Sequence, residues 1–439
     1  MTTIELEQDI KELIMPENLK IGMMVNKKRK ENNEGAGEGT YYNYVLGQSP
    51  FHAPKTLRDA LGKHADKNEY GPAQGMSELL QSVSDWNNRH FDINVKPERI
   101  IIGTGTKMIM YMLLKMLKDH VFLPTPSWIG YPPLLDYLEK PYTKLRMRSE
   151  DDFALNPEML DKHFSEVSGP KILILNNPHN PTGTVYKEDA LKEIVKVCKK
   201  HDVTVIADEI YALMTHDLDD FTSMAKLYPE KSFVTNGLSK DRSAAGYRLG
   251  TCILPTTNTK DLREVFVRFA STLYTNVATP IQYAAHESYK KGASIEHYMD
   301  TTREIHGLIG KHLSNYASQI DGLKVSKTEG GFYFVVDFNA YKDVFNKNGI
   351  HSSTDLMYKL LESPYHIALV TGNSIGLSQD DYMARIAFVD YDGEKVYKAY
   401  EKEKPSTDEE KETFVKKHMH HMFVSVKPAV PIILSKSIV

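Results

Sequence analysis

Short apolar runs that alternate with amphipathic helical segments are the feature that most constrains the fold of this chain. Five runs of four to seven residues lie between about residues 70 and 290. They are residues 100–104, 121–124, 171–177, 203–208 and 232–236. Segment 188–201, between the third and fourth runs, carries apolar residues at helical spacing. Because parallel strands need crossover connections, the alternation predicts a three-layer α/β/α domain with a mainly parallel sheet.

The pattern changes after about residue 300, where strand-like and helical segments are grouped differently. The segments are a helix over 301–313, a strand over 332–338, a helix over 355–362 and a strand over 384–389. They predict a smaller α+β domain. We therefore expect an N-terminal arm over residues 1–60 that packs with the small domain, a large domain over 61–300, and the small domain over 301–439 with an extension from about 404.

The N-terminal arm and the C-terminal extension each contain a polar cluster. Residues 27–39 mix a basic run with glycines and acids, which predicts a loop. The basic tetrad 27–30 is interpreted as a solvated charged face, with a nuclear localisation signal as the alternative. The C-terminal cluster contains His418, His420 and His421. It is interpreted as a frayed helix end, with a metal site as the alternative. We expect no metal.

Charge and cysteine content exclude several classes of protein. The 54 basic and 58 acidic residues give a net charge of −4, which offers no electrostatic reason to expect nucleic acid or an acidic membrane as partner. Two cysteines exclude a disulfide framework and a four-cysteine zinc site and favour a reducing compartment. The first ten residues lack a secretion pattern, and no segment approaches the roughly 20 apolar residues of a membrane helix. We expect a cytoplasmic protein.

Unusual residues follow the first two runs. The turn 103–107, which includes Gly105, Thr106 and Lys107, opens onto a strongly apolar helical segment. Free backbone N–H groups at a helix start suit a phosphate, although a glycine there can be purely steric. Trp128 follows the second run, where its ring stacks on a planar ligand or simply packs.

The other three runs end in polar or charged residues. Asn180 follows the third run between two Asn-Pro turns, and Asp208 ends the fourth with Tyr211 three residues on. A buried carboxylate needs a cation or a strong donor. Lys240 and Arg248 follow the fifth run.

One ligand accounts for all of these residues. A phosphorylated aromatic aldehyde with a ring nitrogen needs N–H donors and an arginine for its phosphate, an aromatic ring to stack on, and an acid for its pyridinium. It also needs donors for its phenolate and an amine to form an imine. That ligand is pyridoxal 5'-phosphate.

Five motifs in the same order carry a family resemblance. They are YGPAQG, TPSWIGYP, NPHNPTG, DEIY and SKDRSAAGYRLG. Together they resemble the fold type I pyridoxal-phosphate aminotransferases, the class I/II group, over roughly residues 40–390. The resemblance implies a homodimer with shared active sites, in which Tyr70 reaches the phosphate of the neighbouring subunit.

The resemblance also implies roles for the cofactor residues. Lys240 would form the internal aldimine and shuttle protons, and its cationic neighbours should lower its pKa. Asp208 would keep the ring nitrogen protonated, and Trp128 would stack on the ring. Asn180 and Tyr211 would bind the phenolate oxygen. The phosphate would be bound by Gly105, Thr106, Lys107, Ser239 and Arg248.

The substrate residues also follow from the resemblance. Arg385 matches the arginine that binds the α-carboxylate, where its planar fork suits two oxygens. Gly47 resembles the small residue whose backbone closes over that carboxylate, on an arm that moves as a lid. Trp128 and Asn180 would also contact the substrate. The implied activity is transfer of an amino group from an L-amino acid to a 2-oxo acid by a ping-pong mechanism.

The sequence leaves alternatives open for both the substrate and the type of reaction. Segment 270–276 has no arginine where the dicarboxylate-specific aspartate enzymes carry one, so aromatic amino acids, alanine and aspartate all stay open. One rival on the same scaffold is β- or γ-elimination, as in 1-aminocyclopropane-1-carboxylate synthase or a C–S lyase. A remote rival is a non-enzymatic regulator that binds pyridoxal phosphate.

Overall fold

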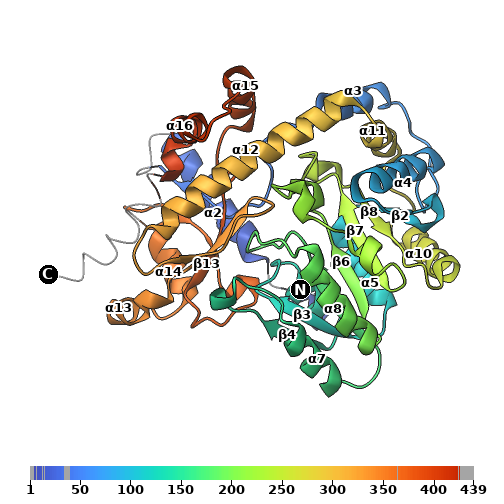
Figure 1. Ribbon diagram of the computed structural model, residues 1–439, viewed down its shortest axis with the longest axis horizontal. Helices are drawn as coiled ribbons and strands as arrows, with labels where there is room; N and C mark the ends of the chain where they lie inside the picture. The colour runs from blue at the N-terminus through green and yellow to red at the C-terminus, as the bar shows by residue number, and fades with distance from the viewer. Residues whose placement is uncertain are drawn as a thin grey trace.

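A seven-stranded sheet forms the centre of the larger lobe (Figure 1). The computed structural model describes residues 15–33, 40–362, 364–423 and 425, together with 4–5, 7–11 and 13. The strand order is β2 (Ile100–Gly103), β8 (Gly250–Ile253), β7 (Ser232–Gly237), β6 (Thr204–Asp208), β5 (Lys171–Asn176), β3 (His120–Thr125) and β4 (Tyr142–Arg146). Only β8 runs antiparallel to its neighbours in this sheet. The predicted mainly parallel sheet is therefore confirmed, and the five apolar runs are β2, β3, β5, β6 and β7.

The sequence did not predict β4 and β8. Strand β4 is an edge strand with the mixed sequence YTKLR, of which only Leu145 is buried. Strand β8 has four residues and begins with a glycine. Neither has the apolar run that marks the other five strands, so only the pairing with their neighbours makes them strands.

Helices cover both faces of this sheet, so successive side chains of a strand such as β2 enter different cores. Ile101 packs with the core that contains α5 (Thr106–Met116) and part of α10 (Thr259–Leu273), whereas Ile100 and Ile102 pack with the core that contains α8 (Glu188–Lys200). The two cysteines are buried in different cores and are free thiols. This three-layer arrangement confirms the predicted fold class.

The smaller lobe is built on a four-stranded antiparallel sheet. Its order is β12 (Val370–Thr371), β13 (Met383–Ala387), β10 (Tyr333–Asp337) and β9 (Lys324–Val325). Helices α13 (Lys342–Lys347) and α14 (Ser353–Leu361) lie beside it, and the long helix α12 (Ala293–Ser318) runs from one lobe to the other (Figure 1). The domain limits stay a prediction; residue 300 lies inside α12.

The N-terminal arm contains a helix where the sequence predicted a loop. Helix α2 covers Glu17–Asn33, so the loop prediction for 27–39 is wrong over 27–33, and residues 34–39 lie outside the described residues. The helix buries Ile21 and Val25. Arg29 donates to the carbonyl oxygen of Tyr41 at 2.7 Å and pairs with Asp390 at 2.7 Å. Contacts between distant parts of the chain therefore stabilise a helix whose local sequence is polar.

The segment that follows the N-terminal arm pairs with a strand more than 300 residues further along the chain. Strand β1 (Tyr42–Asn43) pairs in parallel with β11 (Ile367–Ala368). Near the C-terminus, α15 (Gly393–Glu403) and α16 (Asp408–His418) follow. His418 pairs with Glu403 at 3.1 Å, and His421 meets the carbonyl oxygen of Asp390 at 2.6 Å. The described residues contain no group of three metal-ligating side chains.

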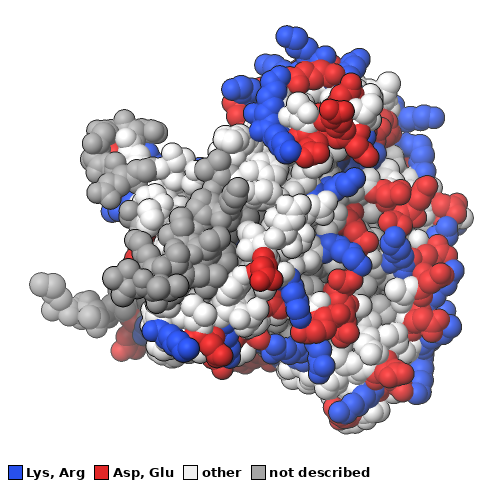
Figure 2. Space-filling view, turned by 60° about the vertical axis from the view of Figure 1, so that its left-hand side comes forward, with Lys and Arg blue, Asp and Glu red and all other residues white. Residues whose placement is uncertain are grey.

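Basic and acidic side chains are interspersed over the face shown in Figure 2. No helix in the described ranges combines the length and apolar character needed to cross a membrane.

Candidate active site

A cavity of about 230 Å³ lies at the carboxyl ends of the parallel strands. It is lined by Thr106, Lys107, Met110, Trp128, Asn176, Asn180, Asp208, Ile210, Tyr211, Ser239, Lys240, Ala245 and Arg248. Most of the sequence-predicted cofactor residues are in this set, although they come from five separate strand ends. Parallel strands end at one edge of the sheet, which brings these distant segments together.

Lys240 follows β7 and points into the cavity with a perturbed amine. Burial of the ammonium, and after it the charge of Arg385, lowers the pKa of Lys240 to about 7, against the opposing effect of Asp208. Its Nζ donates to the carbonyl oxygen of Gly47 at 2.6 Å. The expected lowering is present, with burial as a larger cause than the cationic neighbours. Near neutral pH this amine can hold or release a proton.

Asp208 ends β6 and is buried, with three donors around its carboxylate. Tyr131 donates to Oδ2 at 2.7 Å and Thr235 donates to Oδ1 at 3.3 Å, with the Ile210 N–H at 3.4 Å. Burial nevertheless raises the pKa of Asp208. The protein therefore compensates this carboxylate only in part, and a cationic ring nitrogen would supply the missing partner.

The amino end of α5 forms a cradle for an anion. No side chain caps this end, so its first backbone N–H groups have no intrahelical acceptor. Gly105 precedes the helix at φ +81°, and a Cβ there would lie 2.6 Å from Nη2 of Arg248. Ser239 and Arg248 line the same space. N–H donors, a hydroxyl and a guanidinium are the groups that bind a phosphate.

Two aromatic residues flank the cavity. Trp128 packs edge-on against Tyr131, with ring centroids 5.0 Å apart. Gly130 makes room for the indole, because a Cβ there would lie 2.3 Å from the Trp128 ring. Tyr211 contacts Tyr333 through their hydroxyl groups at 2.8 Å. Burial raises the pKa of Tyr211 well above its usual value, so the phenol stays protonated and can donate.

Arg385 lies beside the cavity, on β13 of the smaller lobe. Its Nη1 donates to Oδ1 of Asn180 at 3.3 Å and its Nη2 donates to the carbonyl oxygen of Val45 at 2.5 Å. Its Nε finds no partner among the described residues, although the side chain is 2% exposed. A buried guanidinium without a counter-charge is costly, and a carboxylate would satisfy it.

Four of the predicted residues do not line the cavity: Gly105 and Arg385, described above beside it, and Gly47 and Tyr70. Gly47 approaches Lys240 through its carbonyl oxygen, and a Cβ at this position would overlap the hydroxyl of Tyr333. Tyr70 is 87% exposed and takes no part in the cavity of its own chain. Its predicted contact with a neighbouring subunit stays a prediction.

Sequence reasoning missed two tyrosines of the site. Tyr131 holds Asp208, and Tyr333 contacts Tyr211 and lies under Arg385, whose Cζ is 4.6 Å from the ring centroid. Tyr131 stands within the quoted motif TPSWIGYP, three residues after Trp128, which was the only signal available. Tyr333 lies in a buried strand, where nothing local distinguishes it from a core residue.

The residues present suit pyridoxal 5'-phosphate in each of its parts. The cradle at α5 suits the phosphate, Asp208 the ring nitrogen, and Asn180 with Tyr211 the phenolate oxygen. Oδ1 of Asn180 is used by Arg385, which leaves the amide nitrogen as its donor. Lys240 supplies the amine. This donor set is what the chemistry of the group requires.

Comparison with known proteins agrees with this geometry. The sequence model of the family described as aminotransferase class I and II matches residues 40–401. An aspartate aminotransferase of Bacillus subtilis is 29% identical over 341 residues, which cover 75% of this chain and 83% of that protein. An asparagine–oxo-acid transaminase of Streptococcus mutans is 28% identical over 347 residues, 76% of this chain and 84% of that protein.

Solved structures share the fold at lower sequence identity. An aspartate aminotransferase of Thermus thermophilus with maleate superposes with a TM-score of 0.77 at 19% identity, covering 96% of this chain and 100% of that one. An aspartate aminotransferase of Rhizobium meliloti gives a TM-score of 0.77 at 20% identity, covering 97% and 99%.

Proposed function

The chain belongs to the class I and II aminotransferases, which use pyridoxal 5'-phosphate, and from this premise we propose that it transfers the amino group of L-aspartate to a 2-oxo acid. The observation that carries the proposal is the cavity in which Lys240, Asp208 and Arg248 meet at one edge of the sheet.

The cofactor residues have separate tasks in this proposal. When bound, pyridoxal 5'-phosphate supplies an aldehyde carbon that takes up the amino group and a ring that accepts electrons. The amine of Lys240 would hold the cofactor covalently and would take and return the substrate α-proton. Asp208, held by Tyr131, binds the ring nitrogen, and Tyr211 and Asn180 donate to the phenolate oxygen. Trp128 would cover the ring, and the phosphate would be held by Gly105, by the backbone N–H groups of Thr106 and Lys107, and by Ser239 and Arg248.

The substrate α-carboxylate binds Arg385 in this proposal. The guanidinium is buried, and its present partners are two neutral oxygens, of Asn180 and Val45. A carboxylate is a stronger acceptor than either oxygen. Gly47 closes over the carboxylate because its missing side chain leaves space beside Tyr333.

The choice of an acidic substrate rests on two supports. Several relatives are named aspartate aminotransferases, although each shares less than a third of its residues with this chain. Within the cavity, the ammonium group of Lys107 lies 5.3 Å from the ring centroid of Trp128 and has no ion-pair partner among the described residues. Burial lowers the pKa of Lys107, an effect that a bound carboxylate would offset.

Elimination is the less favoured reaction, since the relatives are named for transamination. We also propose a homodimer in which Tyr70 reaches the site of the partner, and a cytoplasmic location. The support for the dimer is the 87% exposure of an aromatic side chain that has no role in its own cavity.

A panel of amino donors and 2-oxo acids tests the proposal. We expect purified holoenzyme to be yellow and to convert L-aspartate only when a 2-oxo acid is present, with ping-pong kinetics. Ammonia release without an acceptor would indicate elimination instead. Lys240→Ala should lose turnover. It should also lose the covalent cofactor adduct that borohydride reduction makes permanent in the wild type and that mass spectrometry detects. Lys226→Ala, which removes an exposed lysine paired with Asp92, is the matched control.

A further inference from the structure

The turn that carries Lys240 is bonded at two points to the segment that carries Gly47. The N–H of Ser243 donates to the carbonyl oxygen of Lys240 at 3.0 Å, which closes the turn. In the segment 47–52, the carbonyl oxygen of Gly47 accepts from Nζ of Lys240 at 2.6 Å. The second contact joins the hydroxyl groups of Ser49 and Ser243, whose oxygens are 2.6 Å apart. The turn and the segment are therefore also linked away from the reacting amine.

A third hydroxyl group extends this link. Oη of Tyr298 lies 2.8 Å from Oγ of Ser243 and 2.7 Å from the carbonyl oxygen of His52. Burial raises the pKa of Tyr298, so the phenol keeps its single proton. Because a carbonyl oxygen can only accept, the phenol donates to His52 and accepts from Ser243, which in turn accepts from Ser49. These three hydroxyl groups form a directed hydroxyl network that begins and ends in the segment 47–52.

Ser243 has a backbone conformation that does not suit a serine. Its φ is +49°, in the left-handed region that glycine adopts readily and that is unfavourable for residues with a Cβ. Strained positions of this kind cluster where function requires a particular geometry. A glycine would fit the turn better but has no hydroxyl group. The contacts of the hydroxyl group are therefore what a serine adds at this position.

The turn itself is anchored in the core. Arg242, two residues after Lys240, is 1% exposed, and its Cζ lies 4.2 Å from the ring centroid of Trp86 and 4.3 Å from that of Tyr289. A guanidinium between two aromatic rings is attracted by both. The turn therefore holds its place independently of the segment 47–52.

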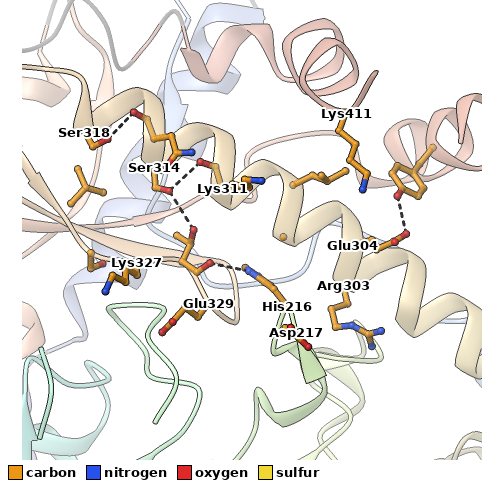
Figure 3. Close-up of a pocket in the computed structure, with 17 residues that line it drawn as sticks. His216, Asp217, Arg303, Glu304, Lys311, Ser314, Ser318, Lys327, Glu329 and Lys411 are labelled. Atoms are coloured by element: carbon orange, nitrogen blue, oxygen red, sulfur yellow. Dashed lines mark hydrogen bonds between the residues drawn. The ribbon is translucent and has the colours of Figure 1, made fainter. Parts of the chain in front are cut away.

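Helix α12, which carries Tyr298, is also anchored. Glu304 accepts from the hydroxyl of Tyr400 at 2.8 Å, and the hydroxyl oxygens of Ser314 and Thr328 lie 3.3 Å apart. The dashed lines at Glu304 and Ser314 in Figure 3 mark these two bonds, beside the groove that runs along the helix. The hydroxyl network thus connects the segment 47–52 to two anchored parts of the protein.

We propose that Ser243 is a positioning residue that, through the hydroxyl network, holds Gly47 where its backbone closes over the substrate α-carboxylate. The inference rests on the proposed function for the role of Gly47. Ser243 does not line the active-site cavity, so it acts through the segment 47–52 and not on the reacting atoms. Its hydroxyl group is common to both contacts of the network. Without it, neither Ser49 nor Tyr298 is bonded to the turn.

Two substitutions separate the hydroxyl group from the backbone. Ser243→Ala removes the hydroxyl and keeps the strained backbone, whereas Ser243→Gly removes the hydroxyl and relieves the strain. In both holoenzymes we expect the KM of the amino donor to rise about tenfold, which corresponds to about 1.4 kcal/mol, with kcat within about twofold of the wild type. A wild-type KM in Ser243→Gly would overturn the proposal, because only the backbone would then matter.

Hydrogen–deuterium exchange of the holoenzyme gives a second readout that needs no turnover. The backbone N–H groups of the segment 47–52 should exchange about tenfold faster in both Ser243 variants, since fewer contacts oppose local opening. Ser318→Ala is the matched control, because it removes a hydroxyl of α12 that donates only within the helix, to the carbonyl oxygen of Asn315 at 2.8 Å. Wild-type exchange in the Ser243 variants would overturn the proposal.

Tyr298→Phe breaks the same network from α12. We expect the same rise in the KM, and no further rise in the double variant Ser243→Gly/Tyr298→Phe, because either change breaks the network. Effects that add in the double variant would show that the two hydroxyl groups act separately, which contradicts the proposal. Tyr358→Phe, at a tyrosine that is 37% exposed, is the control.

The two readouts separate this inference from the proposed function. Every amino acid donor carries an α-carboxylate, so the kinetic comparison uses whichever donor the panel of amino acids identifies. If the wild type converts no donor, the proposed function fails, while the exchange rates of the segment 47–52 still decide whether Ser243 holds it.

Discussion

At the scale of single residues, burial of charged groups decides the chemistry of the site. Lys240 has a pKa of about 7 because its ammonium is removed from water beside Arg385. Asp208 keeps a raised pKa despite the hydroxyl of Tyr131. Lys240 can therefore exchange a proton near neutral pH, which a surface lysine with its ordinary pKa could not.

The role of Lys107 can be measured through substrate preference. If its ammonium group binds the side-chain carboxylate of aspartate, Lys107→Met should raise the KM for L-aspartate by about tenfold, since a lost charged partner costs about 1.4 kcal/mol or more. The KM for L-alanine, which has no second carboxylate, should change little. An equal rise in the KM for L-aspartate and L-alanine would show that Lys107 does not bind the side-chain carboxylate of the substrate.

Glu209 predicts a specific pH dependence of stability. It is buried behind Asp208, accepts from the N–H of Met224 at 2.7 Å, and burial raises its pKa to about 8. The folded protein therefore holds a proton that the unfolded chain releases above about pH 4.5, the ordinary range of a glutamate. Its contribution to stability is present at low pH and is lost as the pH rises toward 8.

Glu209→Gln tests this linkage, because glutamine keeps the acceptor oxygen and does not ionise. We expect the variant to lose less stability than the wild type between pH 5 and 8, by about 1.4 kcal/mol for each unit of pKa shift, in urea unfolding of the apoprotein. Parallel pH profiles for the two proteins would contradict the raised pKa.

At the scale of elements, the turns that follow the strands form the binding surface. The turn between β2 and α5 is tight, because Gly105 has a positive φ and a Cβ there would lie 2.6 Å from Nη2 of Arg248. It exposes the helix start to the cavity. Any other residue at position 105 would require either the backbone or the guanidinium of Arg248 to move.

Gly105→Ala should therefore weaken cofactor binding. The backbone of Gly105, at φ 81° and ψ 157°, is one that essentially only glycine adopts and costs an alanine about 1 to 3 kcal/mol, and the added Cβ displaces Arg248 from the phosphate cradle. We expect the dissociation constant of pyridoxal 5'-phosphate, measured by fluorescence titration of the apoenzyme, to rise about tenfold or more. Gly246→Ala is the matched control, since a Cβ there meets no atom within 4 Å; an equal loss in the control would contradict the argument.

At the scale of the whole molecule, contacts between distant segments hold the two lobes around the site. Arg29 of α2 pairs with Asp390, and the same carboxylate accepts from the N–H of Asn43 at 2.8 Å. Helix α12 joins the lobes, and α16 packs against it. The arm and the C-terminal helices are thus parts of one structure with the small lobe.

Removal of the α16 anchor should destabilise that structure. Phe414 is 2% exposed and packs edge-on against Tyr400, with centroids 5.4 Å apart. Phe414→Ala should lower the free energy of unfolding by about 3 to 5 kcal/mol, as for other buried aromatic residues. Thermal unfolding checks this, with the exposed Lys416→Ala as control. An unchanged unfolding temperature would show that α16 contributes nothing to the fold.

The sequence by itself determined the elements whose signal is local. Apolar runs marked five strands of the large sheet, and turn chemistry after them marked Gly105, Asn180, Asp208 and Lys240 as candidates, because strand ends in a parallel sheet share one edge. The sequence-based prediction was wrong over residues 27–33, where the polar composition predicted a loop. These residues belong to helix α2, which the pairing of Arg29 with Asp390 stabilises.

Only the tertiary structure decided the contacts between residues that no local pattern links. Tyr211 and Tyr333 are 122 positions apart and share a hydrogen bond, and Arg385 meets Asn180 across 205 positions. The pKa of Lys240 follows from burial, which depends on every segment around it. Periodicity and turn chemistry report how a segment folds, whereas packing of the whole chain decides which segments meet.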